Sequence, residues 1–201
     1  MSAVVVFIFS LQGRWQLNIK IMKQKDPMEF NPYKYVDKEN IYPRLDGVLH
    51  QRGYKVATNG CILIRYKCDY PQQFEGKVIG KNGKIVNHWF PNWKNAIPKD
   101  YLDYPVQIDL DIDKILRWRR LRILRMKRKR KYLVKIENTY FDLRLLALAA
   151  EFMKYFGMQK FYVNGNKAAC SRNKKDFVII MPYNFISGTK YSVKHIILKY
   201  S

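Results

Sequence analysis

Three prolines, Pro91, Pro98 and Pro105, divide this chain of 201 residues into two halves. Proline fixes its own φ angle, has no backbone N–H and disfavours the helical conformation of the residue before it. The segment that holds the prolines is therefore predicted to be an extended crossing that cannot be helical. Any fold for this chain must place this rigid crossing between its first and second halves.

The first half is predicted to consist mainly of β-hairpins. Short apolar runs rich in valine, isoleucine and leucine alternate with turn signals such as Asn59-Gly60. The expected turns lie at residues 51–53, 59–60 and 80–83. Residues 14–24 fit either a short helix or a strand.

The apolar run at residues 3–11 is too short for a membrane-spanning helix, which needs about 20 apolar residues. No basic region precedes it, as a secretory signal would require. Its β-branched content favours a buried strand. An alternative is that the native product begins at Met22 or Met28.

The second half is predicted to alternate between helices and strands. A helix over 111–131 has an apolar face and an N-terminal cap at Asp111 or Asp113, and a second helix over 142–156 is stopped by Gly157. The expected strands lie at 132–136, 159–163, 167–171, 176–181 and near 192–199.

Charge restricts the class of partner. Lys and Arg number 38 against 16 Asp and Glu, which gives a net charge of +22. A field of this size favours a polyanion, either nucleic acid or an anionic membrane, and we expect nucleic acid.

The positive charge is concentrated at residues 117–131, where ten of fifteen residues are basic and none is acidic. These ten are the predicted DNA-binding residues Arg117, Arg119, Arg120, Arg122, Arg125, Lys127, Arg128, Lys129, Arg130 and Lys131. Unneutralised like charge on one helix is unfavourable, so a merely solvated helix face explains the run less well. An amphipathic helix for a membrane surface or for a calmodulin-like protein is a further alternative.

Candidate catalytic and metal-binding chemistry is sparse. The three cysteines and three histidines match no zinc-ligand spacing, so we expect no metal or other cofactor. They are Cys61, Cys68, Cys170, His50, His88 and His195. Reduced, buried thiols are the expected state, which suits a cytoplasmic protein.

Asp109, Asp111 and Asp113 alternate along the chain and could serve a metal-dependent nuclease. Their place just before the predicted helix favours a strand end and a helix cap instead. The sequence GKNGK at 80–84 lacks the spacing of a phosphate-binding loop and is typical of a hairpin turn.

Three short segments are more informative together than separately. They are VATNGCIL at 56–63, WFPNWKNAIP at 89–98 and FVIIMP at 177–182. In this order and at these separations they resemble the bacterial DNA polymerase beta sliding clamp family. Residues 140–146 also resemble a helix of that family. A phage or mobile element is an expected source of so short a clamp-like chain.

The resemblance implies an α+β fold, a DNA-clamp-like domain of two pseudo-repeated units, each of a helix plus strands, with the helices on one face of curved antiparallel sheets. It covers about residues 43–183. We expect an N-terminal segment at 1–42, a first unit with its proline-marked crossing at 43–105, a second unit at 106–186 and a tail or extra strand at 187–201.

The resemblance also implies a pocket for linear peptide motifs where the three segments meet. Its expected residues are Thr58, Gly60, Cys61, Ile62, Leu63, Pro91, Ala96, Ile179 and Met181. An apolar floor with a rigid proline rim could bury a leucine or phenylalanine anchor. The chain departs from the family at Asn59, Cys61 and Ile62, where an aspartate, a histidine and an arginine are usual.

We therefore expect a non-enzymatic processivity or scaffold protein. Its expected partners are double-stranded DNA, bound without sequence preference, and polymerase or repair proteins that carry a clamp-binding motif. Homo-oligomers would be needed to close a ring, and no membrane partner is expected. The competing classes are the metal-dependent nuclease and a regulatory nucleic-acid binder that forms no ring.

Overall fold

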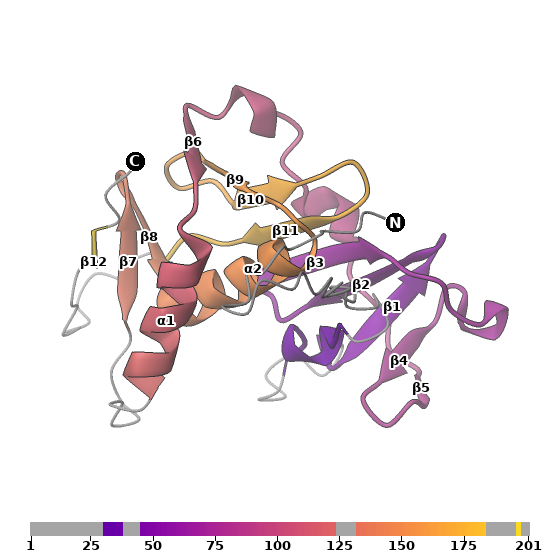
Figure 1. The fold of residues 1–201 in the computed structure, drawn as a ribbon. Helices are drawn as coiled ribbons and strands as arrows, with labels where there is room; N and C mark the ends of the chain where they lie inside the picture. The colour runs from indigo at the N-terminus through magenta and orange to yellow at the C-terminus, as the bar shows by residue number, and fades with distance from the viewer. Residues whose placement is uncertain (1–29, 38–44, 124–131, 184–195, 198–201) are drawn as a thin grey trace, which may run out of the picture. The chain divides into compact units, whose positions relative to one another are not determined.

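A computed structural model describes residues 30–37, 45–123, 132–183 and 196–197 (Figure 1). The chain separates into two compact units, Met1–Asn31 and Pro32–Ser201. Only residues 30 and 31 of the first unit are described, so the fold below is that of the second. The predictions for residues 3–11 and 14–24 lie outside the described residues.

A nine-stranded sheet forms the centre of this unit, in the order β5-β4-β1-β2-β3-β11-β10-β9-β6. Its strands are β1 (Gly47–Gln51), β2 (Tyr54–Thr58), β3 (Ile62–Lys67), β4 (Val78–Gly80), β5 (Ile85–Val86), β6 (Val106–Asp109), β9 (Lys160–Val163), β10 (Ala169–Arg172) and β11 (Phe177–Ile180). All neighbours pair antiparallel. The β3–β11 pair joins the hairpins of the first half to the strands of the second.

A smaller sheet has the order β12-β7-β8. It consists of β7 (Leu133–Ile136), β8 (Thr139–Asp142) and β12 (Ile196–Ile197), with β12 parallel to β7. Two helices, α1 (Ile112–Ile123) and α2 (Leu143–Tyr155), pack side by side, and α2 also contacts β11 (Figure 1). Short 3₁₀ turns occur at η2 (Pro32–Lys34), η4 (Gln72–Phe74), η5 (Trp93–Ala96) and η6 (Tyr101–Asp103).

Local sequence explains where both helices begin. The Asp111 carboxylate accepts a hydrogen bond from the Lys114 N–H at 2.9 Å, so Asp111 rather than Asp113 caps α1. The Asp142 carboxylate accepts from the Arg144 N–H at 2.7 Å and caps α2 in the same way. Gly157, at φ +64°, follows α2 in the left-handed conformation that commonly ends helices.

The core lies on both faces of the large sheet. Ile62, Ile64 and Tyr66 alternate onto the face covered by α2, where the Tyr66 ring lies 5.4 Å from that of Phe156. The opposite face carries Leu63 and Ile179, and the proline-marked crossing packs on it through Trp93. The sheet is therefore covered by a helix on one side and by the crossing on the other.

Several sequence predictions need correction. The crossing is not extended throughout, because η5 and η6 each form one 3₁₀ turn within it. Residues 140–142 belong to strand β8, which was not predicted, and the helix starts only at Leu143. Cys61 is exposed, whereas Cys68 and Cys170 are buried as expected.

The other expected strands and turns of the described ranges are confirmed within a few residues. The first predicted helix is described only as far as Ile123, and the strand expected near 192–199 only at 196–197. Neither α-helix of the described ranges has the length and apolar composition of a membrane-spanning segment.

Candidate functional site

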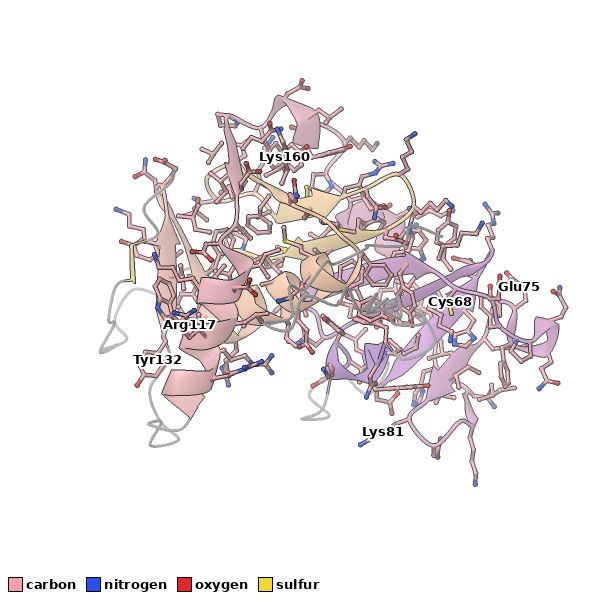
Figure 2. The ribbon with its side chains drawn as sticks, viewed as in Figure 1. Cys68, Glu75, Lys81, Arg117, Tyr132 and Lys160 are labelled. Carbon is pink, nitrogen blue, oxygen red and sulfur yellow. The ribbon has the colours of Figure 1, made fainter. Side chains whose placement is uncertain are left out.

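Helix α1 is the described part of the predicted basic helix at 111–131, and its arginines differ in exposure. Arg117 and Arg120 are exposed on α1, and Figure 2 labels Arg117 there. Arg119 is half-buried, and its guanidinium lies 3.2 Å from the Glu151 carboxylate of α2. Arg122 lies within α1, but the position of its side chain is not described, and residues 125–131 lie outside the described ranges.

Two ion pairs with acidic side chains connect α1 to α2. Glu151 pairs with Lys34 of η2 as well as with Arg119. Asp113 of α1 accepts a hydrogen bond from Lys154 of α2 at 2.6 Å, and this contact lowers the pKa of the Asp113 carboxyl. Glu151 therefore partly neutralises Arg119, so that of the three α1 arginines whose side chains are described, Arg117 and Arg120 are the more available to an anion.

The three aspartates at the start of α1 have structural roles. Asp109 ends β6 opposite Lys160, Asp111 caps α1, and Asp113 pairs with Lys154. Within the described ranges, no three His, Cys, Asp or Glu side chains cluster in a way that could hold a metal ion. The geometry of these residues therefore fits a strand end and a helix cap better than a nuclease centre.

Two of the three family-like segments lie on neighbouring strands. Leu63 of β3 is directly opposite Ile179 of β11, and the Met181 N–H donates to the Cys61 carbonyl at 2.8 Å. The β2–β3 turn is fixed by its own side chains. The Thr58 hydroxyl donates to the Ile62 carbonyl at 2.7 Å, and the Asn59 side-chain oxygen accepts from two backbone N–H groups.

The crossing brings the third segment onto the same face. Trp93 belongs to one buried cluster with Leu63 and Ile179, and Phe90 and Ile97 pack against that cluster. The three segments therefore converge, but Leu63 and Ile179 of the expected pocket floor are buried in a cluster that includes Trp93 of the chain itself. Four of the nine expected pocket residues remain exposed, namely Gly60, Cys61, Ala96 and Met181. Ile62 points to the opposite face of the sheet.

A hollow of about 460 Å³ lies elsewhere on this face, between the edge strands and the start of the crossing. Its lining residues are Leu49, Gln51, Gly76, Lys77, Val78, Ile85, Val86, Asn87, His88, Trp89, Phe90, Pro91, Asn92, Trp93 and Lys94. Pro91 alone among the nine expected pocket residues contributes to it. Sequence reasoning missed this hollow, although the aromatic run at 89–93 was a signal that could have pointed to it.

Arg65 of β3 lies against aromatic side chains of the two neighbouring strands, β2 and β11. Its guanidinium lies 4.4 Å from the ring centre of Tyr54 and 4.6 Å from that of Phe177. It also donates to the Lys175 carbonyl at 3.0 Å. Burial lowers the pKa of Arg65, but an arginine remains charged in proteins, so these contacts stabilise a cation on the aromatic side chains.

Comparison with known proteins shows what class of fold this is. No protein-family model matches the sequence, and no curated protein matches it. Solved structures do match, and those described next are all of bacterial DNA polymerase III beta sliding clamps. The chain has a sliding-clamp-like fold, α+β in composition, with an antiparallel sheet and a few helices.

The Bartonella birtlesii clamp bound to griselimycin has a TM-score of 0.58 and 14% identity, over 76% of this chain and 62% of that one. The Pseudomonas aeruginosa protein has a TM-score of 0.58 and 14% identity, over 75% and 61%. The Bacillus subtilis clamp has a TM-score of 0.54 and 13% identity, over 77% and 60%. This chain thus spans less than two thirds of the length of these proteins.

Proposed function

We propose that this protein is a clamp-like DNA-binding processivity or scaffold protein and not an enzyme. The observation that carries the proposal is a sliding-clamp-like fold in which α1 exposes Arg117 and Arg120. The sequence carries seven further basic residues at 122, 125 and 127–131. Contacts of this kind with phosphates hold a protein on DNA without reading base sequence.

The proposed architecture is two pseudo-repeated units, residues 43–105 and 106–186, with the helices facing the DNA. Both α-helices of the described ranges belong to the second unit, so the helix expected in the first unit is absent from its described residues 45–105. Support comes from the β3–β11 pair, which makes one continuous sheet from the strands of both units. A sheet that spans both units gives the helices a rigid support. Copies of this chain would have to associate to surround a duplex, so we propose a homo-oligomer on DNA.

A second part of the proposal is partner recruitment. Met181 is 48% exposed beside the Cys61 turn, and Gly60 and Ala96 are also exposed. We place the linear motif of a polymerase or repair protein on this shallow patch. Because Leu63 and Ile179 are buried in the cluster that includes Trp93, a motif that inserts an apolar anchor here must open this cluster, which predicts weak binding.

The competing functions have separate tests. A nuclease would cut DNA with Mg²⁺ or Mn²⁺ and lose this activity in Asp109→Asn and Asp111→Ala variants. The structural roles of Asp111 and Asp113 favour the non-enzymatic proposal. A regulatory binder without a ring would hold circular and linear DNA equally well.

Retention on circular DNA tests the proposed function. The protein is loaded on a nicked circular plasmid, and its mass is followed by native light scattering before and after one restriction enzyme linearises the DNA. A clamp-like oligomer stays on the circle at raised salt and is lost on linearisation. Equal loss from both forms of DNA contradicts encirclement and leaves the non-ring binder.

A further inference from the structure

The hollow beside the crossing has an apolar floor and an apolar rim. Leu49, Val78 and Trp93 are buried in its floor, and Val86 packs against them. Two large apolar side chains stand at the rim, Ile85 at 49% exposed and Trp89 at 68% exposed. Apolar surface of this kind, gathered around a cavity, is typical of a binding site rather than of a solvated face.

The charges around the hollow have one sign. Lys77, Lys94 and His88 line it, together with side-chain amides, and no aspartate or glutamate does so in the described part of the chain. Glu75 precedes the lining residue Gly76, but its carboxylate accepts hydrogen bonds from the Tyr70 hydroxyl at 2.6 Å and from the Arg52 N–H at 2.9 Å. The hollow therefore favours a ligand with negative charge beside an apolar group.

The hollow is also held in shape before any ligand binds. The Trp93 indole N–H donates to the Gln51 side-chain oxygen at 3.2 Å, which fixes the crossing to β1. The Gly76 N–H donates to the His50 carbonyl at 2.7 Å, and the His50 N–H donates to the Lys77 carbonyl at 2.9 Å. A preformed site loses little conformational entropy on binding.

We propose that this hollow binds a short acidic peptide segment of a partner protein, with one bulky apolar side chain inserted between Trp89 and Val78. A volume of about 460 Å³ is in the range of ligand sites and holds one or two large side chains. The aliphatic Leu49 and Val78 of the floor, beside Trp93, suit a leucine or phenylalanine side chain. Trp89 and Phe90 also line the hollow, so a stacked nucleobase is the competing ligand. This site is separate from the Met181 patch, and its existence does not depend on DNA binding.

The first test uses a fluorescein-labelled peptide that carries a Leu-Phe pair between glutamates, and a second peptide of equal charge with Ala-Ala in place of that pair. Fluorescence anisotropy should show binding of the Leu-Phe peptide and much weaker binding of its Ala-Ala counterpart. Trp89→Ala should weaken binding about tenfold, as expected for a tryptophan anchor contact. Lys94→Glu should weaken it as well, because it reverses a charge at the site.

Matched controls separate the site from general attraction to a basic protein. Leu102 is 67% exposed but does not line the hollow, so Leu102→Ala should leave affinity unchanged. Lys81 lies exposed at the β4–β5 turn outside the lining, so Lys81→Glu is the control for Lys94→Glu (Figure 2). Equal binding of both peptides, or equal losses in variant and control, would overturn the proposal.

Indole N–H resonances give a second readout in the unaltered protein. The Leu-Phe peptide should shift the signals of Trp89 and Trp93 and leave that of Trp118 on α1 in place. If oligothymidylate shifts Trp89 and Trp93 while the peptide does not, the hollow is a nucleic-acid site and the proposal fails. Duplex DNA that shifts Trp118 reports on the proposed function, so the failure of one proposal is distinguishable from the failure of the other.

Discussion

The Glu151 carboxylate of α2 lies 3.2 Å from the Arg119 guanidinium of α1, and the same carboxylate pairs with Lys34. One acidic side chain thus partly neutralises two basic ones beside the proposed DNA-binding helix. The charge of this helix available to DNA is therefore smaller than its sequence indicates.

Glu151→Gln should strengthen binding of duplex DNA a few-fold, because it removes a negative charge that competes with phosphate for Arg119 and Lys34. Partly exposed ion pairs contribute little to stability, so the free energy of unfolding should fall by less than about 1 kcal/mol. Fluorescence anisotropy with labelled duplex DNA measures the affinity.

The matched control is Asp100→Asn, which removes an equal charge from the exposed pair of Asp100 with Lys167, outside both helices. This variant should change DNA affinity less than Glu151→Gln does. Equal gains in the two variants would mean that net charge alone sets the affinity. The ion pair of Arg119 with Glu151 would then have no separate effect on DNA binding.

Packing at the junction of the two halves gives a stability prediction. Ile179 is 3% exposed, lies opposite Leu63 and belongs to the same buried cluster as Trp93. Ile179→Ala should lower the free energy of unfolding by about 2–4 kcal/mol, because it leaves a cavity in this cluster. Urea unfolding followed by circular dichroism measures this change.

Met181→Ala, two positions further on, is the control for that substitution. Met181 is largely exposed, so this variant should change stability by no more than about 0.5 kcal/mol. A loss as large as that of Ile179→Ala would show that Met181 is buried in solution, and the exposed patch proposed for partner motifs would not exist.

Acid should destabilise the fold through His50. Burial, followed by the charge of Lys55, lowers the pKa of His50 to about 4, whereas Glu75 raises it. The ring is packed 4.7 Å from that of Tyr70 and 5.7 Å from that of Phe74. The unfolded chain binds a proton at this histidine near pH 6.5 and the folded chain only near pH 4. Stability should therefore fall as pH drops through this window. The full shift corresponds to about 3 kcal/mol, which solvent screening reduces to on the order of 1–2 kcal/mol.

Urea unfolding at several pH values tests this effect. His50→Gln should flatten the profile between pH 6.5 and pH 4, the window that follows from the lowered pKa. His88 is exposed, so His88→Gln should keep the slope of the unaltered protein. A steep profile that persists in His50→Gln would assign the acid sensitivity to other groups.

The sequence predicted local structure well where one residue decides the conformation. Asp111 capped the first helix and Gly157 followed the second, because capping and left-handed conformations depend on few neighbours. Strand β8 was missed because residues 140–146 resemble a helix of the clamp family, whereas residues 139–142 pair with β7. The 3₁₀ turns of the crossing were missed because prolines exclude long helices but permit single turns.

Prediction of the candidate site was limited by side-chain direction. The three family-like segments were expected to meet, and they do. The sequence could not show that Trp93 would be buried in the cluster with Leu63 and Ile179 while Trp89 is exposed, since both stand in the same aromatic run. That choice is made by contacts between distant segments, such as the hydrogen bond of Trp93 with Gln51. The same limit applies to Arg119, whose acidic partner is on another helix.

The salt dependence of DNA binding tests the central claim most directly. Affinities of the unaltered protein for two duplexes of unrelated sequence are measured over a range of salt, beside an Arg117→Glu/Arg120→Glu variant and a Lys81→Glu/Lys84→Glu control. We expect equal affinity for both duplexes and a steep decrease with salt. Each lost phosphate contact lowers the slope of log affinity against log salt by about 0.9, so the α1 variant should lose roughly 2 from the slope and the control much less. A slope that is unchanged in the α1 variant, or a strong preference for one duplex, would contradict a clamp-like protein that holds DNA through α1.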